Sequence, residues 1–262
     1  MSDLVVREYG SGAETMVAIH GGPAAAGDLE PLARRLGERW RVLEPYQRGS
    51  GGGLLTVAVH VQDLHDLIRE RCGEQPPVLI GHSWGAMLAL AYAAAHPDTS
   101  RALVLVGCGT FSVAARAEFE ARLEARLTPA DRAALAKIDE MKTDADRRLG
   151  ALGRLMTRVY GHDIDEPANE PEAIDAQAHR QTWHDMIRLQ REGVYPAAFR
   201  AITCPVLMLH GDADPHPGPR TRDDIRPYVP QLEYRELARC GHSPWLERQA
   251  RDEFFAVISK TR

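Results

Sequence analysis

Two features are missing from this 262-residue sequence, and each absence argues against a class of function. No run of lysines and arginines occurs and the net charge is −5, so the clustered basic face that nucleic-acid binding needs is missing. No apolar stretch approaches the roughly 18 residues that a membrane-spanning helix requires. We therefore expect a small-molecule substrate as the partner, with no nucleic acid and no membrane.

Cysteine is also scarce. Of the four cysteines, none forms a Cys-x-x-Cys pair, and Met1–Tyr9 lacks the apolar segment of a secretory signal. Reduced thiols in a cytoplasmic protein are the expectation. The eleven histidines contain no ligand set with sensible spacing, since His179 and His184 are five apart. The sequence thus predicts no metal and no cofactor.

What is present is an alternation of short apolar runs with helical patterns, which is typical of an α/β fold with a mostly parallel sheet covered by helices. Strands are predicted at Leu4–Arg7, Met16–His20, Arg41–Glu44, Pro77–Ile80, Ala102–Val106, Pro205–Leu209 and Leu232–Leu237. Helices are predicted at 56–72, 85–96 and 243–260. Residues 111–200 read as helical apart from an expected loop over 163–173, so we expect a core of 1–110 and 201–262 with an inserted helical cap of 111–200.

The strongest motif is Gly81-His82-Ser83-Trp84-Gly85, which fits G-x-S-x-G between a buried strand and a helix. Such a turn is so sharp that its nucleophile has strained backbone geometry, and the flanking side chains must be small. The serine hydroxyl then stands at a helix N-terminus, where free N–H groups favour developing negative charge. Ser83 is the predicted nucleophile.

A serine hydroxyl needs a base to take its proton, and two histidines are candidates. His82 is adjacent to Ser83, but neighbouring side chains around a tight turn point apart, so we interpret it as a residue that packs beside the site. His242 follows the last predicted strand. In a parallel sheet that loop emerges at the same edge as Ser83, so His242 is the predicted base.

The base needs a carboxylate to orient it, and the loop after the 205–209 strand offers Asp212 and Asp214. Asp214 is far enough past Gly211 to turn back over the sheet edge, and Asp212 suits a turn. The loop Gly107–Thr110 contains no carboxylate. We predict Asp214, with Asp212 as the alternative.

An oxyanion needs two backbone N–H donors. Trp84, directly after the nucleophile, supplies one. His20-Gly21-Gly22-Pro23 follows the second strand, and glycine allows close approach to a substrate, so Gly22 is predicted as the second donor.

Together these motifs resemble the α/β-hydrolase superfamily over nearly the full length. His20-Gly21-Gly22-Pro23, Gln47-Arg48-Gly49-Ser50-Gly51 and Gly81-His82-Ser83-Trp84-Gly85 are most similar to proline iminopeptidases and related capped esterases. The resemblance implies the same triad and oxyanion hole. That group usually has an Asp before Gln-Arg-Gly, where this chain has Tyr46.

Three aromatic residues are candidates for the substrate pocket: Trp183 first, then Trp245 and Tyr160. Core packing is the alternative for each. For function we expect a serine hydrolase that cleaves a small carboxylic ester through an acyl-enzyme intermediate. The alternatives are an aminopeptidase of the proline iminopeptidase kind and a non-catalytic binding protein on the same fold.

Overall fold

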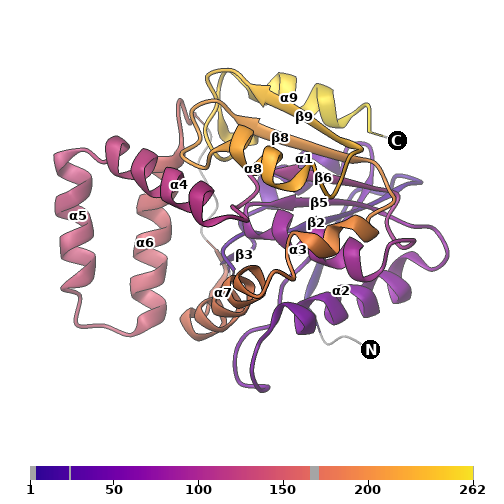
Figure 1. Ribbon diagram of the computed structural model, residues 1–262, viewed down its shortest axis with the longest axis horizontal. Helices are drawn as coiled ribbons and strands as arrows, with labels where there is room; N and C mark the ends of the chain where they lie inside the picture. Colours follow the sequence, from indigo (N-terminus) through magenta and orange to yellow (C-terminus); the bar gives the residue numbers. More distant parts are fainter. Residues whose placement is uncertain (1–3, 24, 166–170, 262) are drawn as a thin grey trace.

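The computed structural model describes residues 4–23, 25–165 and 171–261, built around a seven-stranded sheet (Figure 1). In spatial order the strands are β1 (Val6–Tyr9), β4 (Arg41–Pro45), β2 (Thr15–Ile19), β5 (Val78–His82), β6 (Ala102–Val106), β8 (Val206–Gly211) and β9 (Leu232–Leu237). Only β1 runs antiparallel to its neighbour; every other pair in the sheet is parallel. The predicted fold class is confirmed, because the local apolar runs mark the strands that the sheet buries.

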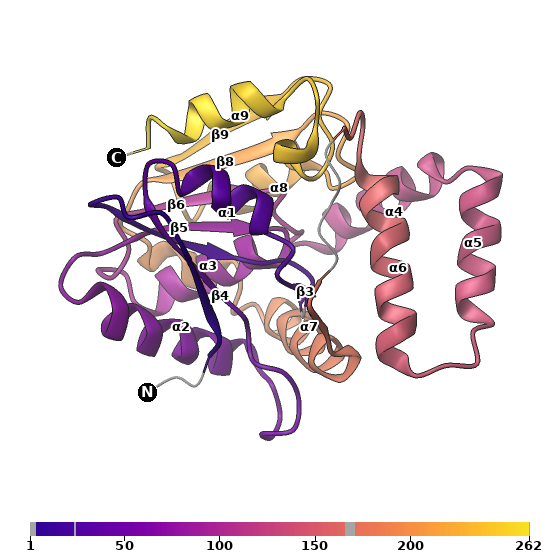
Figure 2. The same ribbon diagram turned by 180° about the vertical axis from the view of Figure 1, so that it is seen from behind.

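Helices cover both faces of this sheet (Figure 2). One face packs against α2 (Val57–Cys72), α3 (Trp84–Ala95) and α8 (Gly218–Ile225), and the other against α1 (Glu30–Leu36) and α9 (Arg251–Ile258). Alternate residues of one strand point to opposite faces of the sheet. Val17 packs in the core under α2 and α3, and Met16 packs in the core under α1 and α9. This two-sided burial explains why β5 and β8 are apolar until His82 and His210, near their carboxyl ends.

The predicted helix over 243–260 is wrong in one respect, because it is divided. A short 3₁₀ turn, η2 (Pro244–Leu246), is followed by Glu247 in extended conformation (φ −90°, ψ 124°), and α9 begins only at Arg251. The Glu247 carboxylate accepts a hydrogen bond from the backbone N–H of Gly241 (3.0 Å). Helical periodicity could not reveal this break, because its cause is a tertiary contact.

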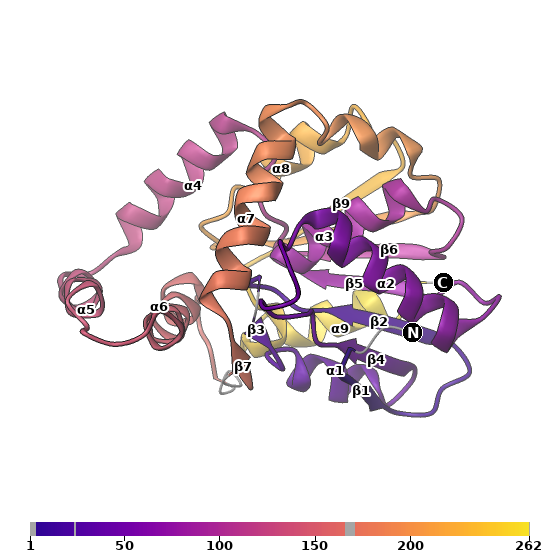
Figure 3. The ribbon, with the colours of Figure 1, turned by 90° about the horizontal axis from the view of Figure 1, so that it is seen from below.

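The insertion between β6 and β8 contains α4 (Val113–Arg126), α5 (Pro129–Asp139), α6 (Ala145–Tyr160), β7 (Ala173–Ile174), α7 (Ala176–Arg191) and η1 (Ala197–Ala201). Figure 3 shows α4, α5 and α6 standing to one side of the sheet, whereas α7 lies close to the body beside α2. The two-residue β7 pairs with β3 (Ala25–Ala26), a small sheet that the sequence did not predict. The boundaries of the insertion as a separate cap stay a prediction.

Two further properties bear on the sequence-based expectations. All four cysteines are free. No helix in the described part of the chain is long and apolar enough to cross a bilayer.

We expect Gly85→Ala to destabilise the fold. Gly85 lies where α3 crosses the end of β2, and a methyl group there would stand well inside van der Waals contact with the Ile19 carbonyl oxygen. Because backbone must shift to relieve the clash, the free energy of unfolding should fall by about 1–3 kcal/mol in a denaturant titration. Gly153→Ala is the control: it lies in α6 with open space around it and should gain about 0.5–1 kcal/mol. Equal stability of Gly85→Ala and the wild type would contradict this account of the close approach.

Candidate active site

Ser83 occupies the turn between β5 and α3 with φ of 56° and ψ of −116°. Among the described residues, only Ser83 and Arg239 combine a side chain with positive φ. The Ser83 backbone N–H donates to the Val106 carbonyl (2.8 Å), and its side chain does not cap the helix. The hydroxyl is therefore held at the carboxyl edge of the sheet without being used in capping α3.

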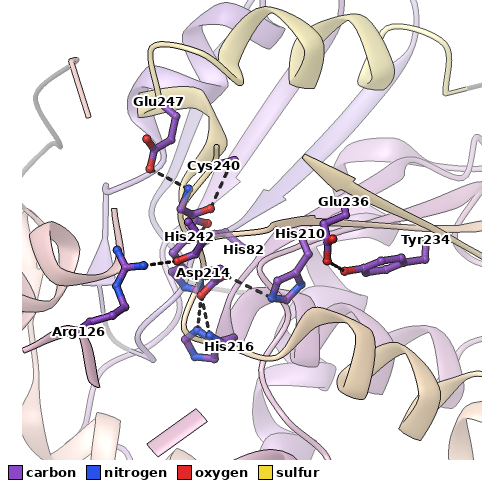
Figure 4. Close-up of polar contacts among 12 residues, drawn as sticks. His82, Arg126, His210, Asp214, His216, Tyr234, Glu236, Cys240, His242 and Glu247 are labelled. Atoms are coloured by element: carbon purple, nitrogen blue, oxygen red, sulfur yellow. Dashed lines mark hydrogen bonds and ion pairs between the residues drawn. The ribbon is translucent and has the colours of Figure 1, made fainter. Parts of the chain in front are cut away.

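His242 and Asp214 meet at the same edge (Figure 4). The Nδ1 atom of His242, in the loop after β9, lies 2.7 Å from Oδ2 of Asp214, in the loop after β8. Burial works against the charged form of Asp214, but the adjacent His242 and His216 hold the pKa of this carboxyl well below its usual range. The carboxylate is consequently ionised, and it accepts the Nδ1 hydrogen of His242.

Asp212, the alternative carboxylate, has a different surrounding. It is exposed, and its Oδ1 accepts the backbone N–H of Cys240 (3.1 Å). Its own N–H donates to the Leu237 carbonyl (3.0 Å), so Asp212 links the loops after β8 and β9. The geometry therefore brings Asp214, and not Asp212, to His242.

His82 packs beside the site as the sequence predicted. Its Nε2 lies 3.1 Å from the His242 carbonyl oxygen, and its ring centroid is 4.6 Å from that of His242. Burial lowers the pKa of His82 well below its usual range, so the ring is neutral and donates to the carbonyl. Trp245 packs edge-on against His82 at 4.7 Å and lies in the core, 4% exposed. It contacts His82 from the core side, and its role as a pocket residue stays a prediction.

Gly107 directly follows β6, and the carbonyl of the preceding residue, Val106, accepts the Ser83 backbone N–H (2.8 Å). A Cβ at Gly107 would stand 2.8 Å from Nδ1 of His242. Among the described residues, no hydrogen bond joins Ser83 to His242. Catalytic hydrogen bonds of ligand-free enzymes are often long and tighten when substrate binds.

The loop after β2 passes close to Ser83, since a Cβ at Gly21 would lie 3.3 Å from the Ser83 Cβ. Gly22 follows with φ of 109° and is exposed. Trp84 is the first residue of α3, and the backbone N–H groups of a first helical turn have no hydrogen-bond partner within the helix. Both predicted oxyanion donors are thus on segments that border Ser83.

Gln47 ties these two segments together, a role that the sequence did not reveal. Its Nε2 donates to the His20 carbonyl (2.9 Å), and its Oε1 accepts the indole N–H of Trp84 (2.8 Å). The backbone N–H of Gln47 also donates to Nε2 of His20 (3.0 Å). The only available signal was its place in the Gln47-Arg48-Gly49 motif.

Two predicted pocket residues come from the insertion. The Tyr160 ring is edge-on to His242 at 5.4 Å, and the Tyr160 carbonyl accepts the His242 backbone N–H (3.1 Å). Trp183 on α7 packs edge-on against Trp84 at 6.4 Å. The structure places both beside residues of the site, although they are far apart in the sequence.

Glu247 and Arg126 fasten the insertion to the site loops, and the sequence singled out neither. Besides Gly241, the buried Glu247 carboxylate accepts the backbone N–H groups of His162 (2.8 Å) and Asp163 (2.6 Å). Arg126, at the end of α4, donates to the carbonyls of Val159, Gly161 and Ala213. No sequence pattern marks these partners, because they lie on distant segments.

A second imidazole on the Asp214 carboxylate was also missed. His216 Nδ1 and its backbone N–H both lie 2.9 Å from Oδ1 of Asp214. Within the described residues, Asp214, His216 and His242 form the one group whose ligand atoms, within 4.8 Å of one another, are close enough to hold a metal ion. In the structure, the two carboxylate oxygens accept hydrogen bonds from the two imidazoles.

Comparison with known proteins adds to this geometry. The model of a family described as alpha/beta hydrolase matches residues 16–257. A proline iminopeptidase of Arabidopsis thaliana is 35% identical over 100 residues, covering 35% of this chain and 26% of that protein. One of Neisseria meningitidis is 32% identical over 98 residues, covering 35% of this chain and 32% of the relative. These alignments thus span about a third or less of the curated relatives.

The likeness to solved structures extends over the whole chain. The crystal structure of an E-2-(acetamidomethylene)succinate hydrolase has a TM-score of 0.66 with 22% identity, covering 98% of this chain and 94% of that one. At this identity the likeness concerns the fold. The family match over residues 16–257 and this shared fold show that the chain belongs to the alpha/beta hydrolase family.

Proposed function

We propose that this protein is a serine hydrolase that cleaves a small carboxylic ester through a triad of Ser83, His242 and Asp214. The observation that carries the proposal is the 2.7 Å contact between Asp214 Oδ2 and His242 Nδ1, at the edge where Ser83 stands in a left-handed turn. Structural roles explain neither the strained serine nor the buried contact between carboxylate and imidazole at the same edge of the sheet.

The tautomer of His242 follows from its partner. An ionised carboxylate only accepts hydrogen bonds, so Nδ1 carries the hydrogen and Nε2 is the free base. Nε2 takes the proton of the Ser83 hydroxyl as Oγ attacks the substrate carbonyl carbon. Asp214 stabilises the imidazolium that forms and does not itself take the proton.

The tetrahedral oxyanion needs donors on the side of Ser83 that faces β2. The backbone N–H groups of Gly22 and Trp84 are proposed for this role, and Gln47 holds their two segments at a constant separation. His242 then gives its proton to the leaving alcohol, which departs and leaves an acyl group on Ser83. Water, deprotonated by His242, releases the acid and restores the serine.

The insertion is proposed to act as a cap that selects the substrate, because Tyr160 and Trp183 reach the site from its helices. The aligned iminopeptidase segments favour a second candidate, an aminopeptidase that releases an N-terminal proline. An ester substrate is preferred here because Tyr46 replaces the aspartate usual in that group.

Ser83→Ala should abolish turnover of p-nitrophenyl acetate, with kcat reduced about 10⁴–10⁶-fold, because no other group can form the acyl-enzyme. Labelling by a fluorophosphonate probe should disappear as well. Circular dichroism serves as the control for folding. Undiminished labelling of the variant would remove Ser83 from its proposed role.

Asp214→Asn should lower kcat by about 10⁴-fold, because an amide no longer fixes the base tautomer of His242. The matched control is Asp212→Asn, which changes a carboxylate two residues away whose contact is with the Cys240 backbone. Its kcat should stay near the wild-type value. The opposite ranking in steady-state kinetics would transfer the acid role to Asp212.

Ester and aminopeptidase activity are separated by comparing p-nitrophenyl acetate with a proline arylamide. We expect kcat/KM to be higher for the ester by about 10²-fold or more, because Tyr46 stands where the iminopeptidase group usually has an aspartate. Preference for the arylamide would support the aminopeptidase instead. Ser83→Ala should be inactive toward both substrates, because both reactions need the nucleophile. The substrate comparison therefore tests specificity alone and not the triad.

A further inference from the structure

His216 lies against both members of the Asp214–His242 pair. Its Nδ1 and its backbone N–H approach Oδ1 of Asp214 at 2.9 Å each, whereas His242 uses Oδ2 (Figure 4). Its ring is also stacked on the His242 ring, with centroids 4.5 Å apart and planes 19° from parallel. One side chain therefore restrains the carboxylate and the imidazole together.

We propose that His216 is a positioning residue for the reaction: it holds Asp214 by the oxygen that His242 does not use and keeps the His242 ring in plane by stacking. This inference rests on the proposed serine hydrolase function and extends it. His216 need not touch substrate for this role, which it performs through Asp214 and His242.

The hydrogen-bond roles in this group follow from charge. Asp214 is ionised and accepts only, so Nδ1 of His216 must carry a hydrogen. Burial lowers the pKa of His216 to about 4, despite the nearby carboxylate, so its ring is neutral above that pH. A neutral His216 stabilises the Asp214 carboxylate by donating a hydrogen bond and adds no positive charge of its own. The imidazolium that pairs with Asp214 during the reaction is then that of His242.

The ionisable groups that face this pair come from several elements. His210 of β8 lies 3.3 Å from Asp214 Oδ2, and Tyr160 of α6 is edge-on to both rings at 5.4 Å. Burial raises the pKa of Tyr160, and His82 is held neutral by burial, so neither adds a charge near neutral pH. Asp214 is thus the negative charge that His216 and His242 share.

His216 also links the pair to the insertion. Phe119 of α4 stacks on the His216 ring in turn, at 4.3 Å and 26°. The series Phe119, His216, His242 runs from the insertion to the base, so the packing of α4 helps to fix the plane of the His242 ring.

Two variants of the full chain separate the two contacts that His216 makes, and a third serves as the control. His216→Phe keeps an aromatic ring for the stack but removes the Nδ1 donor. His216→Asn keeps an N–H donor near the position of Nδ1 but removes the ring. His184→Asn, an exposed residue of α7, is the control for the substitution itself. The probes are p-nitrophenyl acetate turnover from pH 5 to 9 and the rate of fluorophosphonate labelling.

We expect His216→Phe to lower kcat about tenfold to a hundredfold with little change in KM, because the base is misoriented while substrate contacts remain. Its acid limb of kcat/KM should move to higher pH, because an Asp214 carboxylate with one donor fewer attracts the His242 cation more strongly. Labelling should slow in parallel. His216→Asn should recover a large part of the loss, and His184→Asn should match the wild type.

Wild-type kcat and an unmoved acid limb in His216→Phe would overturn the inference. Equal losses in the Phe and Asn variants without a pH shift would do the same, since the hydrogen bond to Asp214 would then make no contribution. If His216→Phe does not fold, as judged by circular dichroism, His216→Leu replaces it as the variant without a donor. Full activity of Ser83→Ala would instead overturn the proposed function, and this inference with it.

Discussion

A buried carboxylate keeps its charge only where hydrogen-bond donors surround it, and Asp214 imposes this requirement on the candidate site. Both oxygens are satisfied, Oδ2 by His242 and Oδ1 by His216. The donors come from the loops that follow β8 and β9, which are parallel neighbours. The need to satisfy one charge therefore draws these two loops together and sets the tautomer of the base.

The same loops are also the ones to which the insertion is attached. Glu247 joins Gly241 to residues 162 and 163, Arg126 joins the end of α6 to Ala213, and the Tyr160 carbonyl holds the His242 backbone. Because the residues after α6 and the base share these bonds, a movement of the insertion would also displace His242. The substrate selection that we propose for the insertion would thus be physically connected to the orientation of His242.

Much of the fold could be predicted, because apolar runs and helical periodicity are local signals. The seven strands of the main sheet lie within two residues of their predicted ends. The failures have two causes. The final helix is divided at Glu247, whose carboxylate bonds to the distant His162 and Asp163, contacts that no periodic pattern encodes. The short helices α1 and α8 were not predicted, because segments of seven and eight residues are too short to show a clear helical periodicity.

The sequence by itself determined the features that arise within a few residues: the strand, glycine and helix that force Ser83 into its turn, and the placement of His242 after the last strand of a parallel sheet. Only the tertiary structure decided which carboxylate faces that histidine. Asp212 and Asp214 are two residues apart and chemically identical, so the choice depends on which of them turns inward to the imidazoles and which remains exposed. His216, Glu247, Arg126 and Gln47 entered the site in the same way, since their roles come from partners that folding alone brings within bonding distance.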